Sequence, residues 1–317
     1  SIENSLRLLK KDGILCVIIP KNFLVGRPYV SLRQMILQKY TIEKIIDLGQ
    51  AFSKQSVRGE QIVLLVKKRR ATQEHKIQFK KLDIDERIMI EKYCILQRTF
   101  NDTITPLNSL IQQTIHKNIS HVSFDSQFKY AGRGKSKKGG EVIVGGDLLK
   151  FGYKERKGKY GSKIILQNIY SSESGIIGAL ELVPLKFGET LTVIDLHDYS
   201  NAMYVLSWLH SRLINYFIFF GVFNESRLTN KLDKKYISQL PYVEPSQSQR
   251  KKVSMLCERL LNFRIKGSDC YAELEWHSIF AKIDQCIYDI YGLDQTTRIR
   301  IDETMREFQS IKWNKND

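Results

Sequence analysis

A single aromatic side chain stands in a polar loop directly after an apolar segment. Residues 42–48 are mostly apolar and lead into Leu48-Gly49-Gln50-Ala51-Phe52, and a further apolar run, Ile62 to Val66, follows a short polar gap. Open α/β sheets bind their ligands beyond the carboxyl ends of the strands, where a flat ring can stack on a nucleic-acid base. The alternative for Phe52 is an ordinary loop aromatic tucked under the sheet, the commoner fate of a phenylalanine.

The segments around this loop alternate between helical and strand patterns. Residues 2–9 carry a helical apolar stripe that stops at Lys11-Asp12-Gly13, and Ile14 to Ile19 is an unbroken apolar run ending at Pro20. A run that is apolar on both faces predicts a strand inside a parallel or mixed sheet. Residues 30–40 then predict a second helix, and residues 42–48 and 62–66 two more strands. This order predicts the closing half of a doubly wound sheet without its opening half.

Four motifs follow one another through these segments: a helix ending in Leu-Leu-Lys-x-Gly, an apolar strand ending in Pro, a Leu-Arg helix, and an Ile-Ile-Asp-Leu strand before a Phe loop. They occur as Leu8-Leu9-Lys10-Lys11-Asp12-Gly13, Ile18-Ile19-Pro20-Lys21-Asn22-Phe23-Leu24, Leu32-Arg33 and Ile45-Ile46-Asp47-Leu48-Gly49-Gln50-Ala51-Phe52. The series resembles the gamma-class adenine-N6 DNA methyltransferases of restriction-modification systems. A looser resemblance to the target-recognition domains of that family includes Gly146-Asp147-Leu148, Lys163-Ile164-Ile165-Leu166, Leu209-His210-Ser211-Arg212-Leu213-Ile214-Asn215 and Leu240-Pro241.

The resemblance implies a base-flipping mechanism, in which Phe52 stacks on a target adenine drawn out of duplex DNA. The residues that would line the adenine pocket beside it are Pro20, Lys21, Asn22, Lys54 and Gln55. The alternative for Pro20, Lys21 and Asn22 is that they simply end a strand. The methyl donor would be S-adenosylmethionine, and the N6 amine would attack its methyl group directly, with no metal required.

Two motifs of that family do not occur in this sequence. There is no Asn-Pro-Pro-Tyr to hold the target amine, and no Gly-x-Gly that opens a helix after an early strand to bind the cofactor. We therefore expect S-adenosylmethionine to be bound mainly by residues upstream or on another polypeptide. A start in mid-fold at Ser1 favours a fragment, which taken alone should not methylate DNA.

The net charge of +16 and the isoelectric point near 9.5 suit a polyanionic partner. Much of the excess lies in two Gly-rich loops with interleaved tyrosines, one carrying Arg133, Lys135, Lys137 and Lys138 and the other Lys154, Arg156, Lys157, Lys159 and Lys163. Glycines allow a close approach to phosphates and lysines displace counterions, so the loops predict a surface facing double-stranded DNA. The alternative is a solvated, mobile surface.

Two further side chains have the chemistry of direct base readout. Asn224 and Arg227 lie in a polar stretch that follows an apolar helix, and Asn pairs well with adenine and Arg with guanine in the major groove. Capping and turn formation are equally good explanations for these residues. None of the six histidines has metal-ligand spacing, so no metal site is predicted.

The rest of the sequence is mainly β and then helical. Short β-branched and aromatic runs fill residues 122–193, a strongly apolar helix is predicted from Tyr204 to Phe219, and residues 246–317 have a helical pattern. The predicted fold class is α/β plus α+β: the closing half of a doubly wound methyltransferase sheet, then a mainly β target-recognition domain and a helical tail. The predicted boundaries are 1–105 for the catalytic half, 106–245 for the recognition domain and 246–317 for the tail.

Several classes of protein are disfavoured by composition. There is no apolar stretch of about twenty residues, as a membrane span requires, and no secretory pattern. Five cysteines without a Cys-x-x-Cys pair predict a reduced, cytoplasmic protein. The resemblance to restriction-modification methyltransferases implies a bacterial or archaeal source.

Two functions from different classes remain open. The first is the carboxyl-terminal part of a site-specific adenine methyltransferase, with double-stranded DNA as its partner and possibly an upstream methyltransferase half or a restriction endonuclease subunit. The second is a non-enzymatic DNA-binding specificity subunit, which would use the same recognition surface but would not depend on Phe52.

Overall fold

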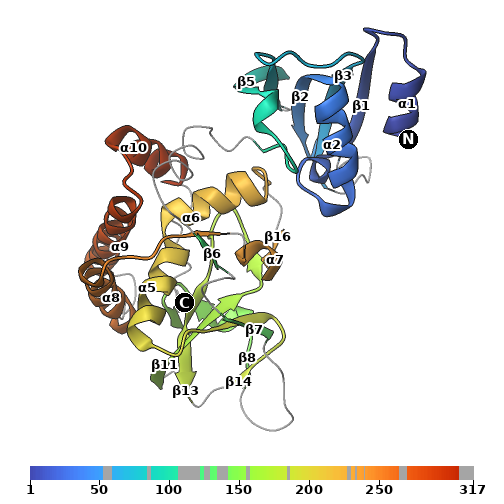
Figure 1. Cartoon of the computed structure of the whole chain (residues 1–317). Coiled ribbons are helices and arrows are strands. Elements are labelled where there is room, and N and C mark those ends of the chain that lie inside the picture. The colour runs from blue at the N-terminus through green and yellow to red at the C-terminus, as the bar shows by residue number, and fades with distance from the viewer. Residues whose placement is uncertain are drawn as a thin grey trace. The chain divides into compact units, whose positions relative to one another are not determined.

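Five strands form one mixed sheet in the amino-terminal part of the chain, as a computed structural model shows (Figure 1). They are β1 (Ile14–Pro20), β2 (Thr41–Gly49), β3 (Gln61–Lys67), β4 (Lys76–Asp83) and β5 (Ile88–Leu96), in the order β1-β3-β2-β4-β5. Strand β3 runs antiparallel to β1 and β2, β4 runs parallel to β2, and β5 returns antiparallel to β4. Strands β1, β2 and β4 therefore point the same way, and their carboxyl ends lie at one edge of the sheet.

The structure describes residues 1–52, 59–83, 87–105, 122–124, 129–133, 142–154, 158–183, 186–226, 230–232, 234–238, 240–263 and 270–306, and only the backbone of residues 91, 122–123, 129–133, 235 and 270. The chain divides into a first unit, Ser1–Ser109 with Phe220–Leu228, and a second unit, Leu110–Phe219 with Thr229–Asp317. The predicted helical tail thus belongs to the same compact unit as the predicted recognition domain.

Two helices cover the sheet of the first unit, α1 (Ile2–Leu8) and α2 (Val30–Lys39) (Figure 1). Helix α1 starts at Ser1, whose hydroxyl oxygen accepts the N–H of Asn4 at 3.4 Å, an ordinary N-cap. Leu6 and Ile36 are fully buried against Ile62 and Leu64 of β3. The helices and strands predicted for residues 2–9, 14–19, 30–40, 42–48 and 62–66 are confirmed.

Strand β1 differs from the prediction in its place within the sheet. Among the described strands it pairs with β3 alone, so it lies at the edge and not inside. Ile14 and Ile18 are each more than half exposed, and Cys16 is exposed between them. The apolar run is therefore buried on one face only.

A four-stranded antiparallel sheet lies at the centre of the second unit. Its strands are β7 (Lys129–Arg133), β11 (Lys159–Gln167), β13 (Gly178–Val183) and β15 (Leu191–Asp195), in the order β13-β11-β15-β7. The described part of this unit also has four pairs of two-residue strands: β6 (Val122–Ser123) with β17 (Pro241–Tyr242), β8 (Val142–Ile143) with β14 (Lys186–Phe187), β9 (Leu148–Leu149) with β10 (Gly152–Tyr153), and β12 (Ile169–Tyr170) with β16 (Asn230–Lys231). The mainly β character predicted for residues 122–193 is confirmed for those of them that the structure describes.

Helices complete the second unit: α5 (Tyr199–His210), α6 (Arg212–Phe217), α7 (Lys234–Ile237), α8 (Gln247–Asn262), α9 (Cys270–Ile290) and α10 (Gln295–Thr304). A π-helical turn at Ile218–Val222 crosses the boundary between the two units. Single turns of 3₁₀ helix occur at Lys21–Leu24, Arg27–Tyr29, Gln97–Thr99 and Gly145–Asp147. Helix α8 packs beside α5, and α9 packs against α8 (Figure 1). The helical pattern predicted from residue 246 is confirmed wherever the tail is described.

The apolar helix predicted from Tyr204 to Phe219 is two helices. Ser211 has an extended backbone, and its hydroxyl oxygen accepts the N–H of Ile214 at 3.4 Å, so it ends α5 and caps α6. The chain bends by 50° at this point. Among the described residues no single helix is long and apolar enough to cross a membrane. The bent pair on either side of Ser211 has the required length and apolar composition only when its two parts are counted together.

Candidate target-base edge and nucleic-acid interface

The carboxyl ends of β1 and β2 meet on either side of the first residue of β3. Gln61 pairs with Pro20 on one side and with Gly49 on the other. The residues that follow β1 and those that follow β2 therefore emerge next to each other. The sheet thus brings together the two short segments that the sequence singled out, residues 20–22 and 49–52.

Phe52 lies in a turn directly after β2 and is half-buried, so part of its ring is accessible. The turn begins at Gly49, whose φ of +53° favours glycine, and the N–H of Ala51 donates to the carbonyl oxygen of Leu48 at 3.1 Å. The ring is not sealed inside the core, which is the arrangement that stacking on a base requires. Lys54 and Gln55 lie outside the described residues.

The three residues predicted beside Phe52 divide into two exposed ones and one buried one. Pro20 and Asn22 are exposed at the end of β1. Lys21 is only 7% exposed, because its ammonium turns inward and lies 2.6 Å from a carboxylate oxygen of Asp47 and 3.8 Å from one of Glu60. A direct contact of the Lys21 ammonium with a base, as predicted, does not agree with this geometry.

A small hollow of about 30 Å³ adjoins this ion pair and is lined by residues that include Lys21, Asp47, Tyr93 and Asn224. The hydroxyl of Tyr93 donates to a carboxylate oxygen of Glu225 at 2.6 Å beside it. A volume near that of one water molecule holds neither a purine nor S-adenosylmethionine. The residues that line this hollow therefore do not fit the cofactor, and none of them is assigned to it.

Arg33, from the Leu-Arg motif, is fully buried behind the segment that follows β1. Its guanidinium donates to the carbonyl oxygens of Phe23 and Gly26, at 2.6 and 2.7 Å, and to that of Asp102 at 2.6 Å. Burial lowers its pKa, while the charge of Asp102 opposes that shift. The motif was visible in the sequence, but its carbonyl partners were not, because they lie in loops without a periodic pattern.

Most residues of the two predicted basic loops lie outside the described part of the chain, namely Lys135, Lys137, Lys138, Arg156 and Lys157, together with Arg227. Lys154 and Lys159 are exposed. Arg133 is the last residue of β7, and Lys159 and Lys163 belong to β11 and not to a loop. Lys163 pairs with Glu181 at 3.4 Å.

Strand register separates the two basic segments. Arg133 pairs with Thr192, which pairs in turn with Leu166 near the end of β11, whereas Lys159 is the first residue of that strand. At about 3.3 Å per residue they lie roughly 20 Å apart along the strand. A duplex contacting both would span roughly six base pairs, at about 3.4 Å per base pair.

Asn224 is 2% exposed, and its side-chain nitrogen has no hydrogen-bond partner among the described residues. Its backbone has a positive φ of +52°, which asparagine tolerates better than most residues. An amide buried in this way does not reach a base edge. The prediction that Asn224 contacts DNA is therefore not supported by this structure, and turn formation explains the residue type.

Asn215, at the end of the Leu-Ile-Asn motif, ties the start of α6 to the β-rich part of the second unit. Its amide nitrogen donates to the carbonyl oxygens of Leu209, His210 and Ser211, and its oxygen accepts the N–H of Ile176 at 2.8 Å. A side chain on Gly175 would lie 2.5 Å from this oxygen. The motif is thus structural within this unit.

A buried group of charges connects α6 with α9. Asp284 is 0% exposed; one oxygen accepts the backbone N–H of Arg212 at 2.8 Å and the other accepts its guanidinium at 3.0 Å. Burial raises the pKa of Asp284 to about 7, although Arg212 opposes the shift. Burial lowers the pKa of the nearby Lys150 to about 8 and that of His210 to about 3. This group lies inside the second unit.

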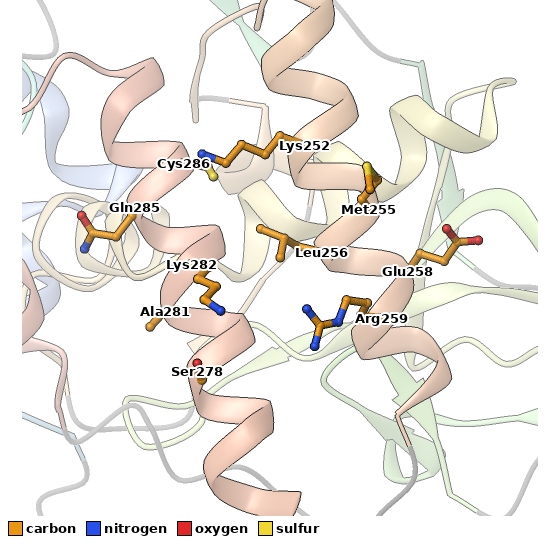
Figure 2. A pocket seen from close by; sticks show the side chains of 10 residues that line it. All are labelled: Lys252, Met255, Leu256, Glu258, Arg259, Ser278, Ala281, Lys282, Gln285 and Cys286. Atoms are coloured by element: carbon orange, nitrogen blue, oxygen red, sulfur yellow. The ribbon is translucent and has the colours of Figure 1, made fainter.

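A groove of about 820 Å³ runs between α8 and α9 (Figure 2). Leu256, Ala281 and Cys286 lie along it, Met255 is 59% exposed, and basic side chains such as Lys252 and Lys282 line it as well. The groove includes none of the residues predicted to contact DNA or the target base. Metal-binding groups of His, Cys, Asp or Glu are absent from the described residues.

Comparison with known proteins agrees with the motifs read from the sequence. Residues 1–53 match the family described as Eco57I restriction-modification methylase. None of the curated proteins matches the chain significantly. Among solved structures, the Type IIL restriction-modification enzyme MmeI in complex with DNA is 12% identical, with a TM-score of 0.55 over 94% of this chain and 50% of that one. The type IIG restriction endonuclease BpuSI is 10% identical, with a TM-score of 0.38 over 91% and 48%.

The chain spans about half the length of the solved structures that it matches. At 12% identity the likeness to MmeI concerns the fold alone: a mixed sheet, further small sheets and helices toward the carboxyl end. The restriction-modification resemblance predicted from the motifs between Leu8 and Phe52 is confirmed. The match to the Eco57I restriction-modification methylase family is limited to residues 1–53.

Proposed function

We propose that this chain supplies DNA recognition and part of the target-base pocket of a site-specific adenine-N6 DNA methyltransferase. The first unit would then be the closing part of the catalytic sheet, and the second unit the recognition domain with its helical tail. The observation that carries the proposal is the half-buried Phe52, in a turn beside the end of β1 and within the segment that matches a methylase family.

Stacking on an extruded adenine is the proposed role of Phe52. A base stacked on an aromatic ring gains roughly 1–3 kcal/mol, which offsets much of the few kcal/mol needed to unstack it from the duplex. Pro20 and Asn22, exposed at the end of the neighbouring strand, are proposed to line the same pocket. Lys54 and Gln55 are retained as candidates for contacts with the base or the adjacent phosphate.

S-adenosylmethionine would supply the methyl group. Since the hollow beside Lys21 is too small for the cofactor, we do not assign cofactor binding to the residues that line it. The role of this chain is to present the adenine, with the ring of Phe52 holding the base in place. A bound metal ion is not part of the proposal.

Exposed lysines of the second unit support a DNA-facing surface. Lys154 and Lys159 would contact phosphates, as would the basic residues that follow Arg133 in the sequence. MmeI, which shares the fold, was solved with DNA bound. A methyltransferase half or a restriction endonuclease subunit is the proposed protein partner.

The test is methyl transfer by the full-length protein, with mass spectrometry of digested DNA to identify N6-methyladenine. Phe52→Ala should lower kcat roughly 10- to 100-fold, the loss expected for stacking, while the Kd for DNA changes by less than about threefold. Phe52→Tyr is the matched control, because it keeps the ring and should retain most of the activity.

Two experimental results would contradict this proposed function. Equal kcat values for Phe52→Ala and the parent would exclude the stacking role. DNA binding without any methyl transfer, together with the absence of an Asn-Pro-Pro-Tyr sequence upstream in the gene, would instead identify a DNA-binding specificity subunit.

A further inference from the structure

We infer that Lys21 is a positioning residue, which holds the two ends of the segment that carries Phe52. The inference rests on the proposed function for its catalytic consequence, but not for its structural part. Its ammonium and its backbone N–H contact residues on both sides of this segment, Asp47 before it and Glu60 after it.

The side chain of Lys21 reaches both carboxylates from a nearly buried position. Its nitrogen lies 2.6 Å from Asp47 and 3.8 Å from Glu60, and the side chains of Lys21 and Glu60 are only 8% and 7% exposed. An ion pair with little access to water is screened less than one on the surface. One cation therefore links two carboxylates that are thirteen positions apart in the sequence.

Backbone contacts extend the link to the turn itself. The N–H of Lys21 donates to the carbonyl oxygen of Glu60 at 2.9 Å. The second oxygen of Asp47 accepts the N–H of Gly49 at 2.8 Å, and Gly49 begins the turn that places Phe52. Because Asp47 contacts Lys21 with one oxygen and Gly49 with the other, the ion pair and the turn share one carboxylate.

The position of Lys21 is itself fixed from behind. It opens the 3₁₀ turn Lys21–Leu24, and the buried guanidinium of Arg33 holds the carbonyl oxygens of Phe23 and Gly26. Arg33 is thus connected to Gly49 by direct contacts: a hydrogen bond to Phe23, the short turn that joins Phe23 to Lys21, and the two contacts of Asp47 with Lys21 and Gly49. Lys21 thus acts on the base through Phe52, and not by touching it.

Hydrogen exchange of the Gly49–Phe52 amides in the full-length protein tests the structural part without any assay of activity. Lys21→Met keeps an unbranched side chain that is one atom shorter but removes its charge, and should accelerate exchange at Gly49 about tenfold, which corresponds to about 1.4 kcal/mol of local stability. Lys21→Arg should stay within about threefold of the parent, because it retains the cation. Lys92→Met, at an exposed lysine that lines the same hollow, should leave exchange unchanged.

If Lys21→Met does not fold, hydrogen exchange in Asp47→Asn provides the same test. The amide oxygen can still accept the N–H of Gly49, whereas the attraction for Lys21 is lost, so exchange should rise less than in Lys21→Met but above the parent. Unchanged exchange in Asp47→Asn and Lys21→Met, or equal acceleration in Lys92→Met, would overturn the inference.

Kinetics of the same variants test the catalytic part. Lys21→Met should lower kcat up to about 100-fold with less than about a threefold change in the KM for DNA, and Lys21→Arg should restore most of the loss. Accelerated exchange with an unchanged kcat would reject the positioning role. If the parent protein transfers no methyl group while exchange responds as expected, the proposed function fails and the structural link of Lys21 stands.

Discussion

Asp47 and Asp284 make the same pair of contacts in two different settings. Asp47 accepts the backbone N–H of Gly49 with one oxygen and the ammonium of Lys21 with the other. Asp284 accepts the backbone N–H of Arg212 with one oxygen and the guanidinium of the same residue with the other. The side chain of Asp47 is 19% exposed at a sheet edge beside Phe52, whereas that of Asp284 is fully buried between α6 and α9. The same kind of contact thus belongs to a candidate site at Asp47 and stabilises only the packing of helices at Asp284. The two roles differ because of the surroundings of each carboxylate, and not because of its contacts.

Removal of Asp284 should have the largest effect on stability. Asp284→Ala leaves the Arg212 guanidinium without its buried carboxylate, and loss of one partner from a buried pair costs about 3–5 kcal/mol. Asp302→Ala is the comparison, because Asp302 contacts the same guanidinium at 3.4 Å but its side chain is 36% exposed; since it also accepts the hydroxyl of Tyr288 at 2.7 Å, its removal should cost about 1–2 kcal/mol, still less than that of Asp284. Urea denaturation of the full-length protein, followed by hydrogen exchange in α9, measures both. Equal losses would erase the distinction between buried and exposed partners.

The pH dependence of the buried group sharpens the comparison further. Between about pH 4 and 7 the folded state holds a proton on Asp284 that the unfolded state has lost, so acidification over this range stabilises the fold. His210 has the opposite effect on stability. Between about pH 6.5 and 3 its imidazole is protonated only in the unfolded state, so acidification over this range destabilises the fold.

Each of these two terms reaches at most about 1.4 kcal/mol per pH unit. From pH 6.5 to 4.5, acidification should stabilise His210→Asn relative to its parent and destabilise Asp284→Asn. Urea midpoints at several pH values provide the measurement. Parallel pH profiles for both variants and the parent would contradict the assignment of these two groups.

A smaller effect is expected at the turn beside Asp47. Gly49→Ala forces an alanine into a backbone with φ of +53°, which costs about 1–2 kcal/mol, although nothing lies within 4 Å of the added carbon. Gly146→Ala is the control, because its added carbon also meets open space but its φ is not positive. Local exchange at residues 49–52 should rise in Gly49→Ala alone. A similar response at Gly146 would point to a general loss of glycine flexibility.

The smallest effect concerns the exposed lysines of the second unit. Lys159→Ala should lower the slope of log affinity for DNA against log salt by about 0.9, the value for one lost phosphate contact. Lys163→Ala, which removes a lysine already paired with Glu181, should change the slope less. Fluorescence anisotropy over a range of salt concentrations measures both slopes. Equal slopes for Lys159→Ala and the parent would exclude Lys159 from the interface.

The sequence predicted the elements around the candidate site better than the contacts within it. Residues 14–19 and 62–66 are apolar runs, so their strands were visible locally, whereas the segment of β5 mixes apolar and charged residues without a clear period. The inward turn of Lys21 depends on Asp47 and Glu60, which only the folded sheet brings near. The break at Ser211 was hidden by apolar residues on both sides, since periodicity alone does not reveal a cap.

Photochemical cross-linking tests the central claim most directly. Once the methylated site has been mapped, 5-iodouracil in place of the target adenine should, on irradiation with the full-length protein, give a cross-link to Phe52. Phe52→Ala should abolish this product while DNA remains bound. A cross-link that maps elsewhere, or that persists unchanged in Phe52→Ala, would contradict the claim that this ring receives the flipped base.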